Sequence, residues 1–418
     1  MLEILATLHH EMVARLQALD NPIERETHFI EMKDKISVAI GMRRTGKTML
    51  MYQKIRSLLQ EGVMLEQILY IDFEDDRLLP VTQQTLSGLI ENFFSLFPEN
   101  HDRLCYLFLD EIQMVDHWAL VVRRFHQTKQ VKIYLSGSSA KLLSTEISTE
   151  LRGRSIATEV FPFSFLEYLK YFMHEPLSPP FAKPIQDNLM THFRAYLASG
   201  GFPGVCIETP LNRTRILQEY VNTVLFRDIV ERHHITHLEL IKYLLHYALK
   251  NHATCLSTHK IYNDLKSQGF KIGRSTVYEY LAFLEDAYLL FTVPLFSESI
   301  RKMQSNPRKL YAIDNGLVNA NSLQLTSNYG RAFENLFYLD LRRQGAEIYY
   351  YLTQARYEVD FVTKNAMGDW HLYQICYDAS SPKTLEREQL ALALAEDELG
   401  IKGHIITMEN YLNWITGS

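Results

Sequence analysis

Four short, nearly continuous apolar runs between residues 36 and 137 predict the strands of a parallel sheet. They read ISVAI, ILYIDF, LCYLFLD and VKIYLSG, and stretches with helical spacing separate them. Strands that are covered by helices on both faces have this composition. Residues 2–20 also show helical spacing. We therefore expect an N-terminal helix and an α/β core over residues 1–164.

Beyond residue 164 the hydrophobic pattern changes twice. Residues 165–252 are mostly helical, with breaks at HEPLSPPFAKP and ASGGFPG, and we expect a helical lid or linker there. Residues 253–297 have the layout of a winged helix, in which the helix TVYEYLAFLEDA precedes an apolar strand. Residues 298–418 are mixed, with a helix near 330–344 and the strands EIYYYL, YEVDFV and WHLYQICY, so we expect a further α/β domain.

Composition is that of an ordinary globular protein. The 418 residues carry a net charge of −6, with 47% apolar and 22% charged residues, which argues against coating nucleic acid by charge alone. The four cysteines form no CxxC pair, so we expect reduced thiols. No apolar run approaches the ~20 residues that span a bilayer, and MLEILATLHHEM is unlike a signal peptide. We expect a cytoplasmic protein with no membrane partner.

A glycine-rich stretch follows the first predicted strand. Gly41-Met-Arg-Arg-Thr-Gly46-Lys47-Thr48 fits the phosphate-binding pattern GxxxxGK[ST]. Backbone N–H groups of such a loop face the β-phosphate, the lysine reaches the β- and γ-phosphates, and the threonine hydroxyl ligates Mg²⁺. The two arginines either contact phosphates or form a basic spot that faces a partner. We assign ATP to Gly41, Met42, Arg43, Arg44, Thr45, Gly46, Lys47, Thr48 and Met49.

The third apolar run ends in two acids that complement this loop. Asp110 is placed to hold Mg²⁺ through water, and Glu111 can orient and polarise the water that attacks the γ-phosphate. With Lys47, these residues predict an Mg²⁺-dependent ATPase.

Polar residues beyond the fourth strand are further candidates. Ser136 and Ser138 can sense the γ-phosphate or position the water, or they can belong to a serine-rich turn. Arg152 or Arg154 can stabilise transition-state charge, in cis or across a subunit interface, or both can be surface arginines. The catalytic candidates are Lys47, Glu111, Ser138, Arg152 and Arg154.

An ordered set of motifs resembles a group of bacterial and archaeal AAA-type ATPases. The motifs are GMRRTGKT, YIDFEDDRL, LFLDEIQ, SGSSAKLLSTEISTELRGRS, FPFSFLEYL, GGFPG and LFRDIVERH. In that group an AAA-like domain precedes an uncharacterised C-terminal domain similar to a restriction endonuclease. The resemblance implies a P-loop NTPase parallel-sheet core with a helical lid, a winged helix and a restriction-endonuclease-like α/β domain. It also implies the nucleotide roles given above and a homo-oligomer.

The expected winged helix raises the question of DNA. Lys260, Lys266, Lys271 and Arg274 are placed to contact phosphates. The helix TVYEYLAFLEDA, however, carries three acids and no lysine or arginine, which suits a major groove poorly. DNA contact and protein packing both stay open for this segment.

The resemblance assigns a second Mg²⁺ site to the C-terminal domain. Glu334 lies in its expected helix, and Asp360 and Gln374 lie in neighbouring strands, where nuclease ligands would stand. Such a nuclease also needs a lysine two positions after the third ligand, and this position is Cys376. A degenerate domain kept for binding or assembly is favoured over an active nuclease.

Three hypotheses follow for function. The first is an ATPase whose nucleotide state rearranges the C-terminal domains, acting on DNA or a nucleoprotein. The second is an ATP-gated DNA nuclease. The third is a slow nucleotide switch or scaffold that recruits a protein partner.

Overall fold

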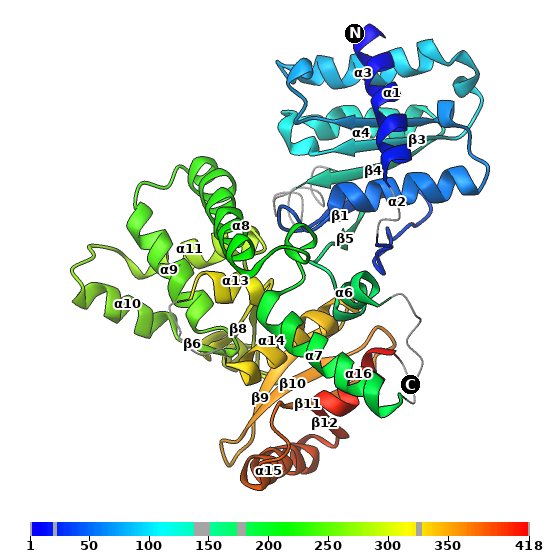
Figure 1. The fold of residues 1–418 in the computed structure, drawn as a ribbon. Coiled ribbons are helices and arrows are strands. Elements are labelled where there is room, and N and C mark those ends of the chain that lie inside the picture. Colours follow the sequence, from blue (N-terminus) through cyan, green and yellow to red (C-terminus); the bar gives the residue numbers. More distant parts are fainter. Residues whose placement is uncertain (1, 20–22, 138–150, 174–180, 323–327, 417–418) are drawn as a thin grey trace. The chain divides into compact units, whose positions relative to one another are not determined.

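The computed structural model describes residues 2–19, 23–137, 151–173, 181–322 and 328–416 (Figure 1). The chain divides into two compact units, Met1–Phe161 and Pro162–Ser418, which are described separately. Among the described residues, no helix is long and apolar enough to cross a bilayer.

Five parallel strands form the sheet of the first unit, in the order β2-β3-β4-β1-β5. The first four strands match the four apolar runs, which confirms the predicted α/β core. β5 has the sequence SIATE, and its polar residues hide it from a search for apolar runs. The strands are β1 (Ile36–Ile40), β2 (Ile68–Asp72), β3 (Cys105–Asp110), β4 (Val131–Gly137) and β5 (Ser155–Glu159).

Helices cover both faces of this sheet because its strands carry apolar residues on both faces. Val38 belongs to one core cluster, with residues of α3 and α4, and its neighbour Ala39 belongs to another, with residues of α2. Leu5 of α1 joins the first cluster, whereas Met12 joins the second. The helices are α1 (Leu2–Ala18), α2 (Lys47–Gln60), α3 (Gln83–Leu96) and α4 (Trp118–Thr128), with 3-10 turns at Leu65–Gln67, Asp76–Leu78, Pro98–His101 and Ile112–Met114.

The strand order brings the carboxyl ends of β1, β3 and β4 together along one edge of the sheet. From β1 the chain passes to β2, the outermost strand on one side. It then returns through β3 and β4 and forms β5 on the other side of β1. In open parallel sheets, ligands bind at the carboxyl ends of the strands where the order reverses. The glycine-rich loop after β1 lies at such a point.

The second unit begins with helices and a three-stranded antiparallel sheet in the order β6-β8-β7. The apolar strand expected before residue 297 is β7, and its partner β8 lies beyond that residue. The strands are β6 (Thr254–Leu256), β7 (Leu290–Val293) and β8 (Arg308–Ala312). The helices are α6 (Phe165–Phe172), α7 (Lys183–Ser199), α8 (Pro210–Thr223), α9 (Leu238–Lys250), α10 (Thr258–Ser267), α11 (Arg274–Asp286), α12 (Ile300–Ser305) and α13 (Asn315–Ala320), with a 3-10 turn at Pro203–Val205 and a π-helix at Val224–Glu231.

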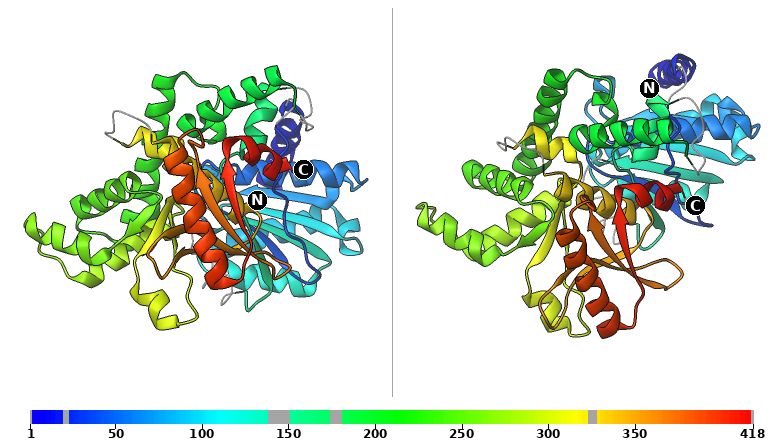
Figure 2. Two further views of the ribbon diagram at one scale, coloured as in Figure 1. Left: turned by 90° about the horizontal axis from the view of Figure 1, so that it is seen from below. Right: turned by 60° about the horizontal axis from the view of Figure 1, so that its bottom comes forward.

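A mixed four-stranded sheet, β12-β11-β10-β9, forms the rest of the second unit (Figure 2). Leu392 of α15 packs against Leu372 on one face, and Phe337 of α14 contacts Phe361 on the other. The helix and three strands predicted here are all present. The elements are α14 (Tyr329–Arg343), β9 (Glu347–Leu352), β10 (Glu358–Lys364), β11 (Trp370–Cys376), α15 (Pro382–Leu399), β12 (Gly403–Thr407) and α16 (Met408–Thr416).

Candidate functional site

Two glycines let the chain turn from β1 into α2. Gly41 has a φ of 150°, and a Cβ atom there would lie 2.3 Å from the carbonyl oxygen of Val160. Gly46 precedes α2 with a φ of 102°, in the region that glycine adopts at little cost. Because α2 begins at Lys47, its first backbone N–H groups lie at the loop.

The Lys47 side chain is folded into the loop. It is 5% exposed, and its ammonium donates hydrogen bonds of 3.1 and 3.0 Å to the carbonyls of Gly41 and Met42. The Thr45 hydroxyl donates to the Met42 carbonyl at 2.9 Å and closes the turn. The loop therefore combines an ammonium with a helix N-terminus, the two features that bind nucleotide phosphates.

Asp110 ends β3 as a buried carboxylate with three hydroxyl partners. Thr48 and Tyr70 donate to its Oδ2 at 2.7 and 2.9 Å, and Ser136 donates to its Oδ1. These partners come from α2, β2 and β4, so the carboxylate joins the elements around the loop. A threonine hydroxyl beside a carboxylate is an oxygen donor pair that suits Mg²⁺.

Glu111 directly follows Asp110 and turns away from the strand. Its φ is 50°, and its N–H donates to the Ser136 hydroxyl at 3.1 Å. The Gln113 amide donates to its Oε2. These contacts hold a half-buried carboxylate at the edge of the sheet, where it can accept a proton from water.

The other residues of the loop differ in exposure. Met42 is buried, and Met49 is half-buried in the first turn of α2. Arg43 pairs with Glu74 at 2.9 Å, whereas Arg44 is exposed with a φ of 68°. Arg43 thus points to the turn after β2, and Arg44 faces solvent.

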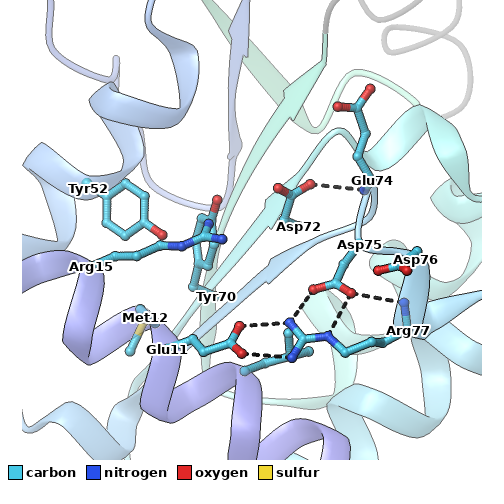
Figure 3. Close-up of a pocket in the computed structure, with 11 residues that line it drawn as sticks. Glu11, Met12, Arg15, Tyr52, Tyr70, Asp72, Glu74, Asp75, Asp76 and Arg77 are labelled. Atoms are coloured by element: carbon cyan, nitrogen blue, oxygen red, sulfur yellow. Dashed lines mark hydrogen bonds and ion pairs between the residues drawn. The ribbon is translucent and has the colours of Figure 1, made fainter.

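A pocket of about 540 Å³ adjoins this site on the β2 side (Figure 3). It lies between α1 and the turn after β2, and Tyr70, whose hydroxyl holds Asp110, is part of its wall. Arg77 ties α1 to that turn through ion pairs with Glu11 at 2.7 Å and Asp75 at 2.5 Å. The N-terminal helix is therefore fastened beside the candidate Mg²⁺ ligand.

Asp72 lies opposite Asp110 in the register of β2 and β3. Burial, together with the carboxylates of Asp110, Glu74 and Glu111, raises the pKa of Asp72 to about 6. Asp72, which lies at the same edge of the sheet as Asp110, therefore changes its charge near neutral pH.

The arginine candidates do not lie at this edge of their own chain, whereas Ser136 does, through its hydrogen bonds with Asp110 and Glu111. Arg154 immediately precedes β5, and its carbonyl accepts from Ile36 N–H, at the amino end of β1. Arg152 lies two residues earlier with a φ of 50°. β1 has five residues, so about 13 Å of strand, at ~3.3 Å per residue, separates Arg154 from the loop. Ser138 lies outside the described residues.

The acids of the predicted second metal site surround a lysine. Lys309, on β8, is 1% exposed. Its ammonium lies 2.8 Å from Glu334, 2.6 Å from Glu358 and 2.9 Å from Asp360. Burial opposes the charged form, but the carboxylates outweigh burial and hold the pKa of Lys309 well above its usual value. The carboxylates thus already share a cation.

Burial and the Asp360 carboxylate raise the pKa of Glu334 to about 8.

Both polar atoms of the Gln374 side chain already have partners, because its oxygen accepts from Asp360 N–H at 3.1 Å and its amide donates to Glu388 at 2.6 Å. Cys376 is buried. In the part of the chain that the structure describes, no group of three or more histidine, cysteine, aspartate or glutamate side chains is arranged as a metal site.

Sequence reasoning missed Tyr70, Lys309 and Glu358. Tyr70 lies inside the apolar run ILYIDF, where it resembles any core aromatic residue. Lys309 left a signal, because a lysine inside the apolar strand RKLYA cannot be buried without carboxylate partners. The identity of these partners depends on the tertiary fold.

Comparisons with known proteins agree with a nucleotide site in the first unit. The AAA domain family matches residues 33–169, and a family described as Domain of unknown function (DUF8612) matches residues 190–328. The chain is 35% identical to the uncharacterized protein MJ1544 of Methanocaldococcus jannaschii over 381 residues, which cover 90% of this chain and 82% of that protein. It is 29% identical to an uncharacterized protein of Haemophilus influenzae over 351 residues, which cover 82% and 84%.

The chain is also similar to two solved structures. The Walker-type ATPase PABY2304 of Pyrococcus abyssi has 16% identity and a TM-score of 0.42, over 68% of this chain and 90% of that one. The ORC1 protein of Aeropyrum pernix, in complex with DNA, has 15% identity and a TM-score of 0.31, over 76% and 91%. At these TM-scores the likenesses carry no argument about function.

Proposed function

Since the chain belongs to the protein family of MJ1544 from Methanocaldococcus jannaschii and contains an AAA domain, we propose that it is an Mg²⁺-dependent ATPase whose nucleotide state rearranges its second unit. The observation that carries this proposal is the Asp110 carboxylate, which accepts from Thr48 and Ser136 beside the Lys47 loop. A P-loop threonine, a β3 carboxylate and a polar β4 residue meet at one edge of the sheet, as phosphoryl transfer to water requires.

Each residue of this edge has a role in the proposed reaction. Lys47 and the N–H groups at the start of α2 bind and orient the β- and γ-phosphates. Thr48 and Asp110 would hold Mg²⁺, which would neutralise negative charge on the phosphates. Glu111 accepts the proton of the attacking water, and Ser136 fixes the backbone of Glu111 and the carboxylate of Asp110.

An arginine at the transition state would come from a second copy of the chain. Arg152 and Arg154 precede β5, at the opposite end of β1 from the loop. Both therefore lie at the end of the sheet that faces away from the loop of their own chain. This arrangement supports a homo-oligomer in which one copy completes the site of another.

DNA or a nucleoprotein is the proposed target of the second unit. Helices α10 and α11, between strands β6 and β7 and completed by β8, fit the winged-helix layout. The four cations assigned to phosphate contact are all exposed: Lys260, Lys266, Lys271 and Arg274.

A protein-directed switch is the second candidate, because the exposed face of α11 beyond its first turn is acidic and apolar. Glu279 and Asp286 are exposed there, and Tyr278 is 58% exposed. Such a face suits a protein partner better than a DNA groove. An ATP-gated nuclease has weaker support, because Lys309 lies among the carboxylates that would hold its metal.

Steady-state ATP hydrolysis by the wild type and by Lys47→Ala tests the proposal. Both proteins are assayed with Mg²⁺, alone and with duplex, single-stranded and branched DNA. We expect Lys47→Ala to lose about 100-fold or more in turnover, because a donor to the transition-state charge is gone. Stimulation of the wild type by one DNA form supports action on DNA. A rate indifferent to DNA favours the switch, and equal rates for both proteins contradict the ATPase.

A further inference from the structure

Arg25 connects the phosphate-binding loop with the end of β5. Its side chain is 4% exposed. One terminal nitrogen donates to the Thr45 carbonyl, in the loop, and the other donates to the Phe161 carbonyl, each at 2.7 Å. A single planar guanidinium therefore joins Thr45 and Phe161, which are 116 residues apart in sequence.

The backbone of Arg25 is fixed as well. Its N–H donates to the Gln53 side chain at 3.0 Å, and its carbonyl accepts from the same amide at 3.2 Å. Gln53 lies on α2, the helix that begins at Lys47. Arg25 is thus held to the helix on one side and to the loop on the other, so it follows any movement of either.

The end of β5 also touches the loop directly. Val160 N–H donates to the Ile40 carbonyl at 2.7 Å, and a Cβ atom at Gly41 would overlap the Val160 carbonyl. Phe161, the next residue, is the last one of the first unit, and the chain enters the second unit at Pro162. A shift of the loop therefore reaches the residue where the chain leaves the first unit.

We propose that Arg25 is a positioning residue that transmits nucleotide occupancy from the Thr45 peptide to the Phe161 peptide, and so to the start of the second unit. This inference rests on the proposed ATP site. Phosphate binding by the loop N–H groups, that of Gly46 included, acts on the peptide whose Thr45 carbonyl Arg25 holds. The guanidinium bonds the two carbonyls through two different nitrogens in a rigid fork, whereas the ammonium of lysine has a single nitrogen. We therefore expect lysine at position 25 to hold one carbonyl and to release the other.

Hydrogen exchange of the full-length protein with and without Mg²⁺–ATP tests the proposal, in the wild type, Arg25→Lys and Arg56→Lys. Arg56 is the matched control, because it is an arginine on α2 whose guanidinium donates to the Leu19 carbonyl, away from the loop. In the wild type we expect ATP to protect both the loop amides, 41–50, and the amides of 155–161. In Arg25→Lys we expect protection of the loop to remain and protection of 155–161 to be lost. ATP affinity should fall by no more than about fivefold, the cost of one hydrogen bond.

The outcomes separate this inference from the proposed ATPase. If ATP protects the amides of 155–161 in Arg25→Lys as much as it does in the wild type and in Arg56→Lys, the inference is overturned and the ATP site stands. A wild type that binds ATP without any change at 155–161 overturns it too. If the wild type shows no ATP-dependent protection of the loop, the proposed function fails first, and the inference falls with it.

Discussion

Thr48 and Asp110 are 62 residues apart in sequence, yet the Thr48 hydroxyl donates a 2.7 Å hydrogen bond to Asp110 Oδ2. The bond joins the start of α2 to the end of β3 across the intervening strand β4. The two oxygen groups of the proposed Mg²⁺ site are thereby held together by the fold itself. This preorganisation means that ion binding needs little rearrangement of the protein.

Asp110→Asn should separate the charge of this residue from its structural contacts. The amide keeps an oxygen that can accept from Thr48 or Tyr70, but it lacks the charge that favours Mg²⁺. We expect turnover of ATP to fall about 100-fold or more, with a small change in melting temperature. Tyr70→Phe is the control, because it removes one hydrogen bond to the same carboxylate and should cost about 1 kcal/mol of stability while turnover persists. Wild-type turnover by Asp110→Asn, in the same phosphate-release assay, would refute the Mg²⁺ role.

Gly41→Ala should destabilise the protein by more than the cost of placing alanine at a positive φ. The new Cβ atom meets the Val160 carbonyl, which is fixed by its place at the end of β5. Gly62→Ala is a matched control, since Gly62 also has a positive φ but has no atom within 4 Å of a Cβ. Chemical denaturation should show a loss above about 1 kcal/mol for Gly41→Ala, and a smaller loss for Gly62→Ala. Equal losses would mean that the contact with Val160 is unimportant.

Lys309→Met should destabilise the second unit strongly. Removal of the ammonium leaves Glu334, Glu358 and Asp360 without their shared cation in a largely buried place. Loss of one partner of a buried ion pair costs about 3–5 kcal/mol, which denaturant unfolding can measure. Lys302→Met, at an exposed position of α12, should change stability little. A comparably small effect at Lys309 would show that the cluster does not depend on its lysine.

Glu334 should make the second unit less stable as pH rises. Its folded-state pKa of about 8 lies above that of an unfolded glutamate, so the folded state binds the extra proton. The resulting stability is complete below the unfolded pKa and is lost as pH rises through about 8. Asp72 and Asp314, whose pKa values burial raises to about 6, act in the same direction at lower pH. Between about pH 6.5 and 8.5, melting temperature should therefore fall in the wild type and fall less in Glu334→Gln. Parallel slopes would contradict the assignment to Glu334.

Local patterns reveal the elements and the nucleotide loop of this chain but leave out what joins them. Apolar runs mark β1 to β4 because buried parallel strands need apolar residues on both faces. β5 has no such run, because three of the five residues of SIATE are polar. GxxxxGK[ST] and the two acids at the end of β3 are local signatures of one chemistry. Lys309 has no such signature for its role, since its three carboxylate partners follow it by 25 to 51 residues and meet it only in the folded unit. The contacts of Arg25 likewise arise from the packing of β5 beside the loop.

The most direct test of the ATP site is Glu111→Gln, with nucleotide binding and phosphate release measured on the same samples. Glutamine keeps the shape of the side chain and an oxygen that can accept from Gln113, but it cannot take a proton from water. The account predicts that Glu111→Gln binds Mg²⁺–ATP as the wild type does and releases phosphate about 100-fold more slowly. Unchanged phosphate release at unchanged binding would contradict it and would remove Glu111 from the proposed mechanism.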